Sequence, residues 1–493
     1  MNQMNWPAVY PAIVLLAMAC VVAMVDLWVT DPRRTTTYWL TLGSVAVVGL
    51  MHLFAFNEGA TVYAAQRMVV ADSMGHLLGV FAAVAVIVSL IYARPYAGER
   101  DMLKGELFTL SMFSLLGIDV MLSANNFLVV YLGLELMTLS LYALVALRRD
   151  HADSTEAAMK YFVLGALASG FLLYGLSMMY GATGSLEISE VFKAIGTGQI
   201  NKSVLVFGVV FVVAGLGFKL GAVPFHMWVP DVYQGAPTAV TLLIGGAPKL
   251  AAFAVTIRLL VEGMSGLGGE WQQMLIVLSV GSMLLGNIVA IAQSNLKRML
   301  AYSSIAQMGF MLLGFTPTVI NVNTLSAANG YSSSMFYITT YVLTTLGTFG
   351  MVMLLSRQGF ESEQIDDLKG LARRSPWFAG MMAILMLSLA GLPPTVGFYA
   401  KLSVLQAVVS TNVAGYIWLA VAAVVLSLVG AYYYLRVIKV MYFDEPTDTR
   451  PIVSTLDVRA VLSINATAVL VLGVLPGGLM TLCRDAIVKA LTT

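Results

Sequence analysis

Four ionisable side chains of this sequence lie deep within strongly apolar stretches. Glu135 stands in the middle of the stretch 125–147, and Lys219, Lys249 and Lys401 lie well inside three later ones. A charge at the centre of a bilayer costs about 2.5–3.5 kcal/mol, so such residues normally face the interior of a helix bundle and serve ion or proton paths. A structural ion pair between Glu135 and one lysine would leave two lysines unexplained. The four residues therefore predict a buried path for protons.

Further ionisable residues lie closer to the ends of the apolar stretches. His226 follows Lys219 by seven residues, which predicts a position two turns further along the same helix face. Lys160 lies nearer the end of its stretch, where it could serve the path or extend its ammonium to the membrane surface. Arg258 is expected to reach the surface in that way. The residues expected to be solvated caps at helix ends are Asp26, His76 and Asp119.

The composition indicates a membrane protein. Hydrophobic residues make up 59% of the 493 residues and charged residues only 11%, against about 45–50% and about 25% in soluble domains. The net charge of +1 gives no indication of nucleic-acid binding. Cys20 and Cys483 lie far apart, and the four histidines lack metal-ligand spacing. A metal, haem or iron–sulfur centre on this chain is therefore not expected.

Fourteen stretches are long and apolar enough to cross a membrane as helices. We therefore predict an all-α polytopic membrane protein with short connections. The connection 183–202 has apolar residues at helical spacing, which predicts a short amphipathic helix at the membrane interface. The predicted spans are 8–29, 38–56, 73–93, 105–122, 125–147, 156–182, 203–228, 237–262, 270–293, 299–315, 330–355, 375–410, 414–435 and 458–482.

The charges of the connections predict the orientation. With fourteen spans, 17 of the 27 basic residues fall on one side of the membrane and 5 on the other. Basic residues favour the cytoplasmic side. Both termini are therefore expected to face the periplasm of a bacterial inner membrane.

Glycine and proline interrupt two of the spans beside buried lysines. The segment from Gly215 to Pro230 surrounds Lys219, and the segment from Gly391 to Gly397 precedes Lys401. Broken helices beside ionisable residues are typical of ion sites in transporters. The breaks fall in spans seven and twelve, which predicts two five-helix repeats, the second inverted in the membrane. The predicted units are peripheral helices in 1–104, the first repeat in 105–262, the inverted repeat in 263–442 and a last helix in 443–493.

Several motifs around these residues resemble those of a known family. They are Gly133-Leu-Glu-Leu-Met137, Gly217-Phe-Lys219, the segment from Pro224-Phe-His-Met-Trp to Gln234, Gly235-Ala-Pro-Thr238, Lys249, the segment Gln293–Met299, Ala301-Tyr-Ser-Ser304, and Gly391-Leu-Pro-Pro394 through to Lys401. Together they resemble the antiporter-like membrane subunits of respiratory complex I, the proton-pumping NADH:quinone oxidoreductase. The likeness covers nearly the whole chain and is densest from about 105 to 440.

The resemblance implies a role for each matching residue. Glu135 matches a glutamate that pairs with the lysine at the position of Lys219, and Lys249 matches the central lysine of a midplane proton axis. Lys401 matches the residue at the exit half of the path. Lys160 matches a lysine near the glutamate, and His226 a histidine of the hydrated axis.

Within the family, two features separate this chain from particular subunits. Its length excludes the long C-terminal lateral helix of subunit L, and Lys401 stands where subunit M is expected to carry a glutamate. The resemblance also implies that FMN, the iron–sulfur clusters and the reacting quinone belong to other subunits, with no cofactor on this chain. Its expected partners are the lipid bilayer and the other membrane subunits of complex I, including the paralogous antiporter-like ones.

Two alternatives remain open at this point. The chain could be a subunit of a multi-subunit sodium/proton antiporter, which belongs to the same superfamily. It could also be an assembly scaffold of a membrane complex, whose polar residues serve helix packing without a proton path of their own.

Overall fold

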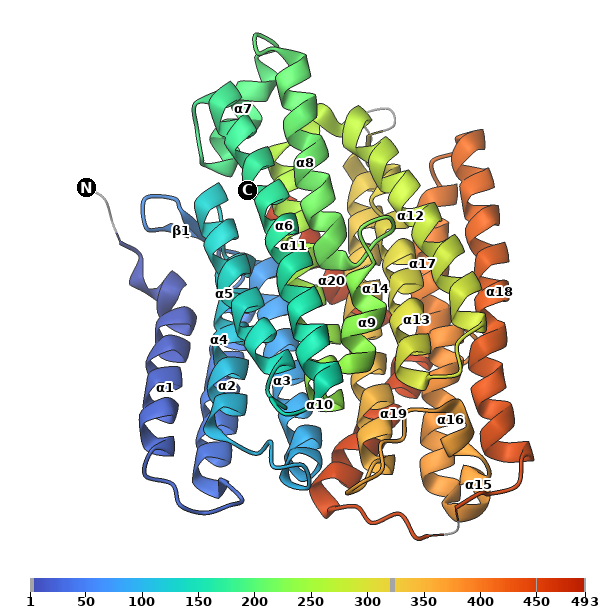
Figure 1. Cartoon of the computed structure of the whole chain (residues 1–493). Helices are drawn as coiled ribbons and strands as arrows, with labels where there is room; N and C mark the ends of the chain where they lie inside the picture. The colour runs from blue at the N-terminus through green and yellow to red at the C-terminus, as the bar shows by residue number, and fades with distance from the viewer. Residues whose placement is uncertain (1–3, 320–323, 449, 492–493) are drawn as a thin grey trace.

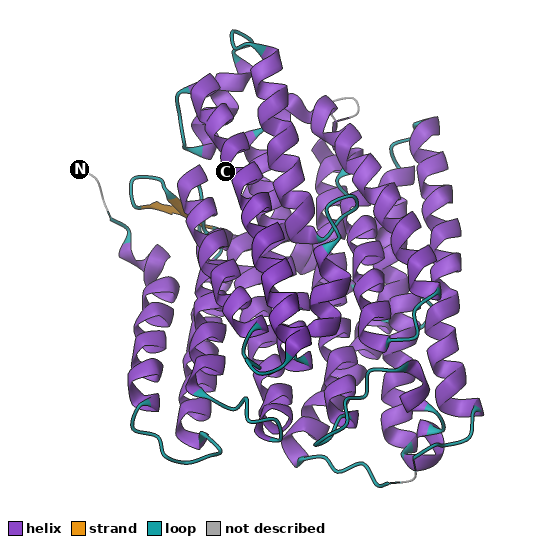
Figure 2. Ribbon diagram, in the orientation of Figure 1, coloured by secondary structure: helices purple, strands orange, loops and turns teal. Residues whose placement is uncertain are grey.

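The computed structural model describes residues 4–319, 324–448 and 450–491, which form a bundle of long helices lying side by side (Figures 1 and 2). One small antiparallel hairpin, β1 (Val62–Ala64) with β2 (Val69–Ala71), was not predicted. The helices are α1 (Tyr10–Asp26), α2 (Thr35–Glu58), α3 (Ser73–Gly98), α4 (Gly105–Leu122), α5 (Phe127–Val145), α6 (Ala152–Thr183), α7 (Ile188–Gly196), α8 (Lys202–Leu220), α9 (Trp228–Gly235), α10 (Thr238–Gly245), α11 (Ala247–Thr256), α12 (Gly268–Ile291), α13 (Leu296–Leu313), α14 (Thr324–Leu355), α15 (Leu371–Arg374), α16 (Pro376–Ala390), α17 (Val396–Val409), α18 (Ala414–Phe443), α19 (Leu456–Val474) and α20 (Gly477–Leu491).

The helices correspond to the predicted spans. Within the described residues, twelve helical segments are long and apolar enough to cross a membrane. The twelfth predicted span consists of two shorter apolar helices, α16 and α17, and the tenth is the more polar helix α13. The last predicted span, 458–482, is wrong at its end, because the backbone leaves the helical conformation at Leu475, directly before Pro476.

Two helices end inside the bundle at glycines, as the sequence predicted. Helix α8 ends at Gly221 (φ +75°) and α16 at Gly391 (φ +82°). In both, the residue after the glycine donates its N–H to the carbonyl five residues earlier, which is the Schellman arrangement that favours glycine. The chain then continues as α9 and α17. A third interruption was not predicted: Gly246, between α10 and α11, leaves the helical conformation.

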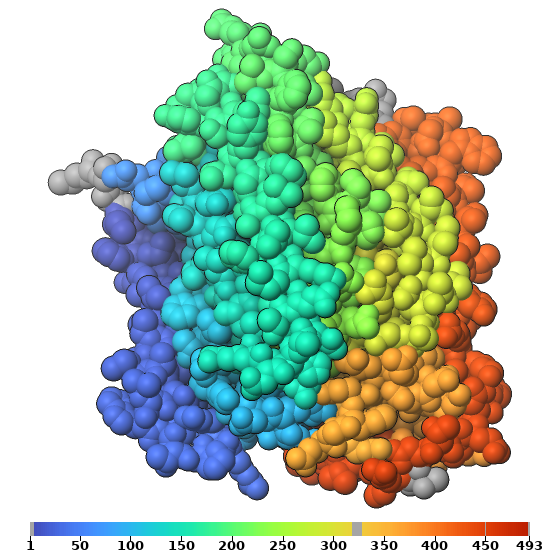
Figure 3. Space-filling view, in the orientation of Figure 1, coloured from blue at the N-terminus to red at the C-terminus, as the bar shows by residue number. Residues whose placement is uncertain are grey.

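The centre of the bundle is formed by two strongly buried segments. One runs from Thr238 to Gly263 and consists of α10, α11 and a π-helical turn, Ile257–Gly263; the other is α14. Helices α1, α18 and α19 lie at the periphery, and the rest of the chain leaves most of their residues uncovered. Figures 1 and 3 show α1 and α2 at one edge of the molecule and α18 at the other. The two cations of the segment 238–263, Lys249 and Arg258, are therefore covered by the rest of the chain.

Helices α4 to α9 pack on one another in the same order as helices α12 to α17. Helix α4 packs on α5, and α12 packs on α13. Helix α6 packs on both halves of the first broken helix, α8 and α9, and α14 packs on both halves of the second, α16 and α17.

Apart from the connections at the helix breaks, the connections lie at two opposite ends of the bundle (Figure 1). We call the end with the β-hairpin and α7 the hairpin face, and the end with connections 27–34, 146–151, 292–295, 356–370 and 444–455 the arginine face. The first and last described segments both lie at the hairpin face. Asn5 donates to the carbonyl of Tyr63 in β1 (2.6 Å), and a Cβ built on Gly59, at the end of α2, would lie 2.8 Å from Nζ of Lys489. Helix α7 is the predicted amphipathic helix, but its apolar side packs on the turn 257–263 rather than on lipid.

Candidate functional site

Lys249 lies at the first helix break. Its side chain is only 2% exposed, and its ammonium donates a 2.6 Å hydrogen bond to the carbonyl of Leu220, the last residue of α8. The final carbonyls of a helix have no partner within the helix and form the negative end of its dipole. The end of α8 at Gly221 therefore creates the acceptor for this amine.

Lys401 occupies the corresponding place at the second helix break. Its ammonium donates to the carbonyls of Leu389 (3.2 Å) and Ala390 (2.9 Å), at the end of α16, and to Oγ of Ser427 on α18 (2.9 Å). Lys401 thus has three neutral oxygen acceptors, whereas a single hydrogen bond holds Lys249. The hydrogen bonds that both amines make within the described residues all go to neutral oxygens.

Lys219 and Glu135 approach each other without making the predicted pair. Lys219 lies in the last turn of α8 and reaches Oγ of Ser169 on α6 at 3.5 Å. Glu135 lies in the middle of α5, and its Oε1 is buried without a hydrogen-bond partner. The carboxylate is close enough to act electrostatically on Lys219, but the described residues include no ion pair between them within 4.0 Å.

His226 does not share a helix with Lys219. Because α8 ends at Leu220, His226 lies in the connection 221–227 before α9, and the prediction of one common helix face is wrong. Its ring is half-buried, and its Nδ1 is among the buried polar atoms of the described residues without a partner.

Lys160 lies apart from the buried amines. Its side chain is 43% exposed, and its ammonium pairs with Glu156 (2.8 Å) and Asp231 (2.9 Å). These residues line a cavity of about 390 Å³ at the arginine face. The carboxylate of Asp231 also receives Arg298 at 2.8 Å, so Lys160 belongs to an ion network at the mouth of the bundle.

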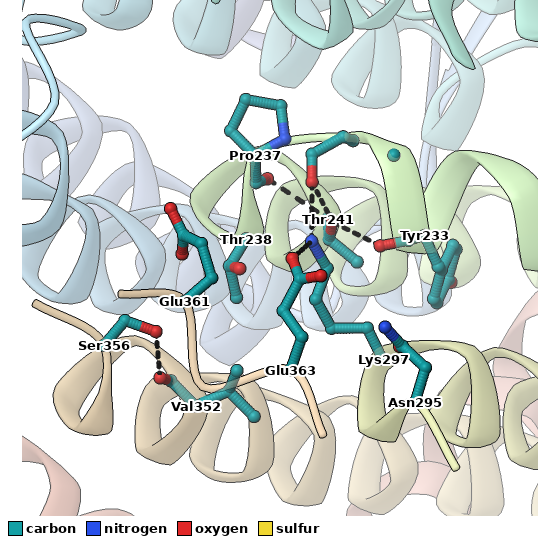
Figure 4. A network of polar contacts seen from close by, with 12 residues as sticks. Tyr233, Pro237, Thr238, Thr241, Asn295, Lys297, Val352, Ser356, Glu361 and Glu363 are labelled. Carbon is teal, nitrogen blue, oxygen red and sulfur yellow. Dashed lines mark hydrogen bonds and ion pairs between the residues drawn. The ribbon is translucent and has the colours of Figure 1, made fainter. Parts of the chain in front are cut away.

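The same cavity contains a buried lysine that sequence reasoning missed. Lys297, which the span prediction placed in a connection, lies in α13 and is only 1% exposed. Its ammonium donates to the carbonyl of Ala236 (2.8 Å) and pairs with Glu363 (3.0 Å). Figure 4 shows Lys297 and Glu363 pointing toward each other beside Thr241, whose hydroxyl bonds backbone carbonyls. Its position beside Arg298 made Lys297 look like a solvated connection residue.

Hydroxyl and amide groups extend the polar region around Lys401. Gln307 donates from Nε2 to the carbonyl of Leu389 (2.9 Å) and to the hydroxyl of Tyr434 (3.1 Å). Tyr337 donates to Oε1 of Gln307, and Tyr434 shares a hydrogen bond with Ser303. The carbonyl of Leu389 therefore joins this network to the amine of Lys401. Nothing in the spacing of these uncharged residues had indicated the network.

Arg258 does not reach the membrane surface, contrary to prediction. It is 1% exposed, and its guanidinium pairs with Asp72 (2.6 Å) and Glu262 (3.0 Å) and donates to the carbonyl of Leu122 (3.0 Å). Two carboxylates lie at contact distance, and they remove the need for Arg258 to extend toward water.

His76 and Asp119 are likewise buried rather than solvated. Nε2 of His52 lies 2.9 Å from Oδ1 of Asp119, and its Nδ1 lies 3.1 Å from Nδ1 of His76. Asp26, by contrast, ends α1 and accepts from Arg34 and Thr37 near the arginine face. Within the described residues, no group of three potential ligands is arranged to hold a metal ion.

An all-helical bundle that holds amines on the ends of broken helices has the architecture of ion-translocating membrane proteins. A family model described as "NADH:quinone oxidoreductase/Mrp antiporter, TM" matches residues 124–430. NADH-quinone oxidoreductase subunit N of Polaromonas naphthalenivorans (strain CJ2) is 61% identical over 99% of this chain and 98% of its own length. The same subunit of Herminiimonas arsenicoxydans is 61% identical over 100% of both chains. This chain therefore belongs to the family of antiporter-like membrane subunits of NADH:quinone oxidoreductase, as the motifs predicted, and its 61% identity to subunit N proteins places it in the subunit N branch.

Solved structures share the fold. A chain of respiratory complex I from Thermus thermophilus with bound aureothin has a TM-score of 0.81 and 29% identity, covering 96% of this chain and 98% of its own. A chain of the Mrp complex from Dietzia sp. DQ12-45-1b has a TM-score of 0.85 at 20% identity, covering 100% and 99%. The second likeness concerns the fold alone.

Proposed function

We propose that this chain carries protons across a bacterial inner membrane as a subunit of NADH:quinone oxidoreductase, along a midplane path of buried glutamate, lysine, histidine and water. Quinone reduction in other subunits drives the movement. Membership of the subunit N family supports the place in the complex. The observation that carries the path is the pair of buried amines, Lys249 and Lys401, each held by helix-end carbonyls.

The acceptors of these amines suit proton transfer. A carbonyl binds an ammonium without neutralising its charge, so a buried lysine on a carbonyl gains less from staying protonated than one on a carboxylate. Lys249 and Lys401 can thus release a proton when a neighbouring charge changes. A lysine held by a carboxylate at contact distance would keep its proton.

The geometry at the end of α8 supports proton transfer between Lys219 and Lys249. Lys249 binds the carbonyl of Leu220, which directly follows Lys219. A positive charge on Lys219 therefore acts on Lys249 through a low-dielectric interior, where like charges repel strongly. Glu135 stabilises the charge of Lys219, and neutralising or withdrawing Glu135 favours passage of the proton toward Lys249. The titrations of these groups are coupled, so none acts alone.

The polar cavity at the arginine face supports this face as the side where protons enter the path. It holds exposed ion pairs at its mouth and the buried amine of Lys297 at its wall. Basic residues concentrate in the connections of this face, which the positive-inside rule assigns to the cytoplasm. Both termini then face the periplasm.

The repeat accounts for the two helix ends, of α8 and α16, that accept these amines, which come from different helices: Lys249 from α11 and Lys401 from α17. We assign residues 105–262 to one five-helix unit and 263–442 to a second, inverted one, with 1–104 and 443–493 peripheral. The two Schellman-type helix ends, at Gly221 and Gly391, support this assignment, as does the parallel packing of α6 and α14 on the two broken helices.

The partners and cofactors follow from the family. The neighbours of this chain are the other membrane subunits of the complex, including the paralogous antiporter-like ones, and lipid. FMN, the iron–sulfur clusters and the quinone belong to other subunits. Identity of 61% to subunit N proteins supports this assignment over a subunit of a sodium/proton antiporter.

Single substitutions in the assembled complex test the path. In inverted membrane vesicles, Lys219→Ala and Glu135→Ala are expected to lower the number of protons pumped per electron, with the complex assembled. Lys202→Ala is the matched control, because that lysine is 74% exposed on the same helix. A normal proton-to-electron ratio in both variants contradicts the path, and failure of both to assemble supports the scaffold alternative.

A further inference from the structure

Three ionisable side chains outside the proposed path form a hydrogen-bonded row. It runs from Asp119 on α4 through His52 on α2 to His76 on α3, with contacts of 2.9 Å and 3.1 Å. The side chains of all three are at least nine-tenths buried. The nitrogen–nitrogen contact requires that one of the two facing Nδ1 atoms carries a proton and the other accepts it.

The row borders water-accessible space at the hairpin face. His52, His76 and Asp119 line a cavity of about 150 Å³ that also includes Ala8 before α1 and Val70 of the hairpin. Its remaining walls are mostly apolar, apart from Asp72 and Ser123. The cavity has room for several water molecules beside polar groups that can bind them.

A second, smaller cavity lies on the midplane side of the row. It measures about 10 Å³ and touches His52 and Asp119 together with Val48, Gly79 and Leu115. Each of these last three residues lies about one helical turn deeper in the membrane than the row member on its own helix. The space suits about one water molecule, so the row separates the outer cavity from a site deeper in the bundle.

The row also adjoins the helix that carries Lys249. Asp72 begins α3, four residues before His76, and its carboxylate receives Arg258 at 2.6 Å. Arg258 lies in the π-helical turn nine residues after Lys249, on the same continuous segment. Helix α11 itself packs on α3 and α4, which carry two members of the row. π-Helical turns within α-helices often mark functional sites.

We propose that His52, His76 and Asp119 form a proton-release site through which this chain delivers protons to the hairpin face. The inference rests on the proposed function, because the protons come from the midplane path. It assigns a role to the N-terminal helices α2 and α3, which the path through Lys219, Lys249 and Lys401 leaves unused.

The transfer step needs no reagent other than water. A proton on Asp119 passes to Nε2 of His52, whose Nδ1 proton passes to Nδ1 of His76, and Nε2 of His76 gives its proton to water in the outer cavity. Each imidazole accepts at one nitrogen and donates from the other. A new proton then reaches Asp119 from the inner cavity. Because both imidazoles line the outer cavity, each returns to its starting tautomer by giving one ring proton to cavity water and taking another from it.

Few charged residues lie near the row formed by Asp119, His52 and His76. Facing it from α3 is Asp72, and from the turn 257–263 come Arg258 and Glu262, which are paired with Asp72 or with each other. The hairpin and the start of α1 contribute no ionisable side chain to the cavity wall. The charge of the row therefore responds mainly to its own members and to the helix of Lys249.

The first test compares proton pumping in variants of the whole complex. His52→Gln and His76→Gln are expected to lower the protons pumped per electron as much as Lys219→Ala does, and each combined with Lys219→Ala should lower it no further. Gly79→Ala keeps every ionisable group but places a Cβ 2.8 Å from the His52 ring, so it should lower the ratio by displacing that ring. Gly43→Ala on α2 is the control, since nothing lies within 4 Å of its added Cβ.

The outcomes separate the two proposals. A lowered ratio in Lys219→Ala with a normal ratio in His52→Gln, His76→Gln and Gly79→Ala overturns the release site and leaves the midplane path. Normal ratios in all variants overturn both. If a histidine variant does not assemble, the proton-to-electron ratio of Gly79→Ala provides the test: a lowered ratio supports the release site and a normal ratio overturns it.

A labelling experiment tests water access independently of pumping. Ser123→Cys, in a Cys20→Ser background, places a thiol in the wall of the outer cavity. A membrane-impermeant thiol reagent is expected to modify it from the hairpin side of intact complex and not from the arginine side. Absence of labelling from the hairpin side overturns the release site.

Discussion

Arg258 and Lys249 are two buried cations on one continuous segment of the chain. They differ in the charge of the groups that they contact. Both are at most 2% exposed. Arg258 has two carboxylates at contact distance, whereas Lys249 has one neutral carbonyl. Nine residues separate them, so the helix itself does not explain the difference.

The contrast shows that burial alone does not make a proton-carrying site. A cation beside carboxylates is compensated, and its charge is permanent when it is a guanidinium. The ammonium of Lys249 donates to one helix-end carbonyl and lies 5.7 Å from the centroid of the Trp228 ring, so less of its desolvation cost is offset. In the path that we propose, this weaker compensation lets the amine alternate between charged and neutral states. Lys401 has three neutral acceptors, so the compensation of its charge is intermediate between that of Arg258 and that of Lys249.

The largest expected effect comes from making the charge of Lys249 permanent. Lys249→Arg should abolish the contribution of this chain to proton pumping, because arginine does not release its proton in proteins. The check is the proton-to-electron ratio in vesicles, with Lys202→Arg as an exposed control on α8. Pumping by Lys249→Arg at the normal ratio would break the distinction between the two cations.

Removing one carboxylate from Arg258 should destabilise the protein strongly. Asp72→Asn leaves a buried charge undercompensated, which costs about 3–5 kcal/mol. The expected result is a lower thermal midpoint and less assembled complex. Glu262→Gln is the matched comparison and should cost less, because the Glu262 side chain is 18% exposed. Equal losses in the two variants would contradict the dominant role of Asp72.

A smaller effect is expected at Lys401. Ser427→Ala removes one of three acceptors, and a hydrogen bond to a charged group contributes about 1.5–3 kcal/mol. The two remaining carbonyls keep the effect near the lower end, so pumping should slow without disappearing. Pumping rates of Ser427→Ala and Lys401→Met in the same vesicles measure the difference. A complete loss in Ser427→Ala would mean that the hydroxyl itself carries the proton.

The smallest effect is expected for an ion pair at the surface. Asp448 accepts the N–H of Arg450 and pairs with Arg357 at 2.6 Å, and both lower the pKa of its carboxyl. A lowered pKa in the folded state adds stability above the unfolded value of about 3.9 and loses it as pH falls below that value. Asp448→Asn should therefore cost about 1 kcal/mol or less at pH 7. The thermal midpoints of variant and parent should converge as the pH falls from 7 to below this lowered pKa, and a constant difference across this range would refute the ionic origin.

Sequence patterns predicted the spans and breaks well because they depend on local chemistry. Apolar runs of sufficient length, such as 105–122, coincide with whole helices, and the glycines that end α8 and α16 adopt the backbone conformation that glycine favours. The errors concern residues whose environment depends on other helices. Arg258, His76 and Asp119 lie near helix ends, where solvation is the common outcome, but each meets a partner from a distant part of the chain.

The amino-acid sequence by itself determined that the chain crosses a membrane many times, that its helices break near Lys219 and Lys401, and that ionisable groups lie at mid-depth. These properties follow from hydropathy and from backbone preferences, which act over a few residues. Only the tertiary structure decided which oxygen each amine contacts, that Lys297 is buried, and that His52 joins Asp119 to His76. Such contacts depend on distances between helices, and the packing of the whole bundle sets those distances.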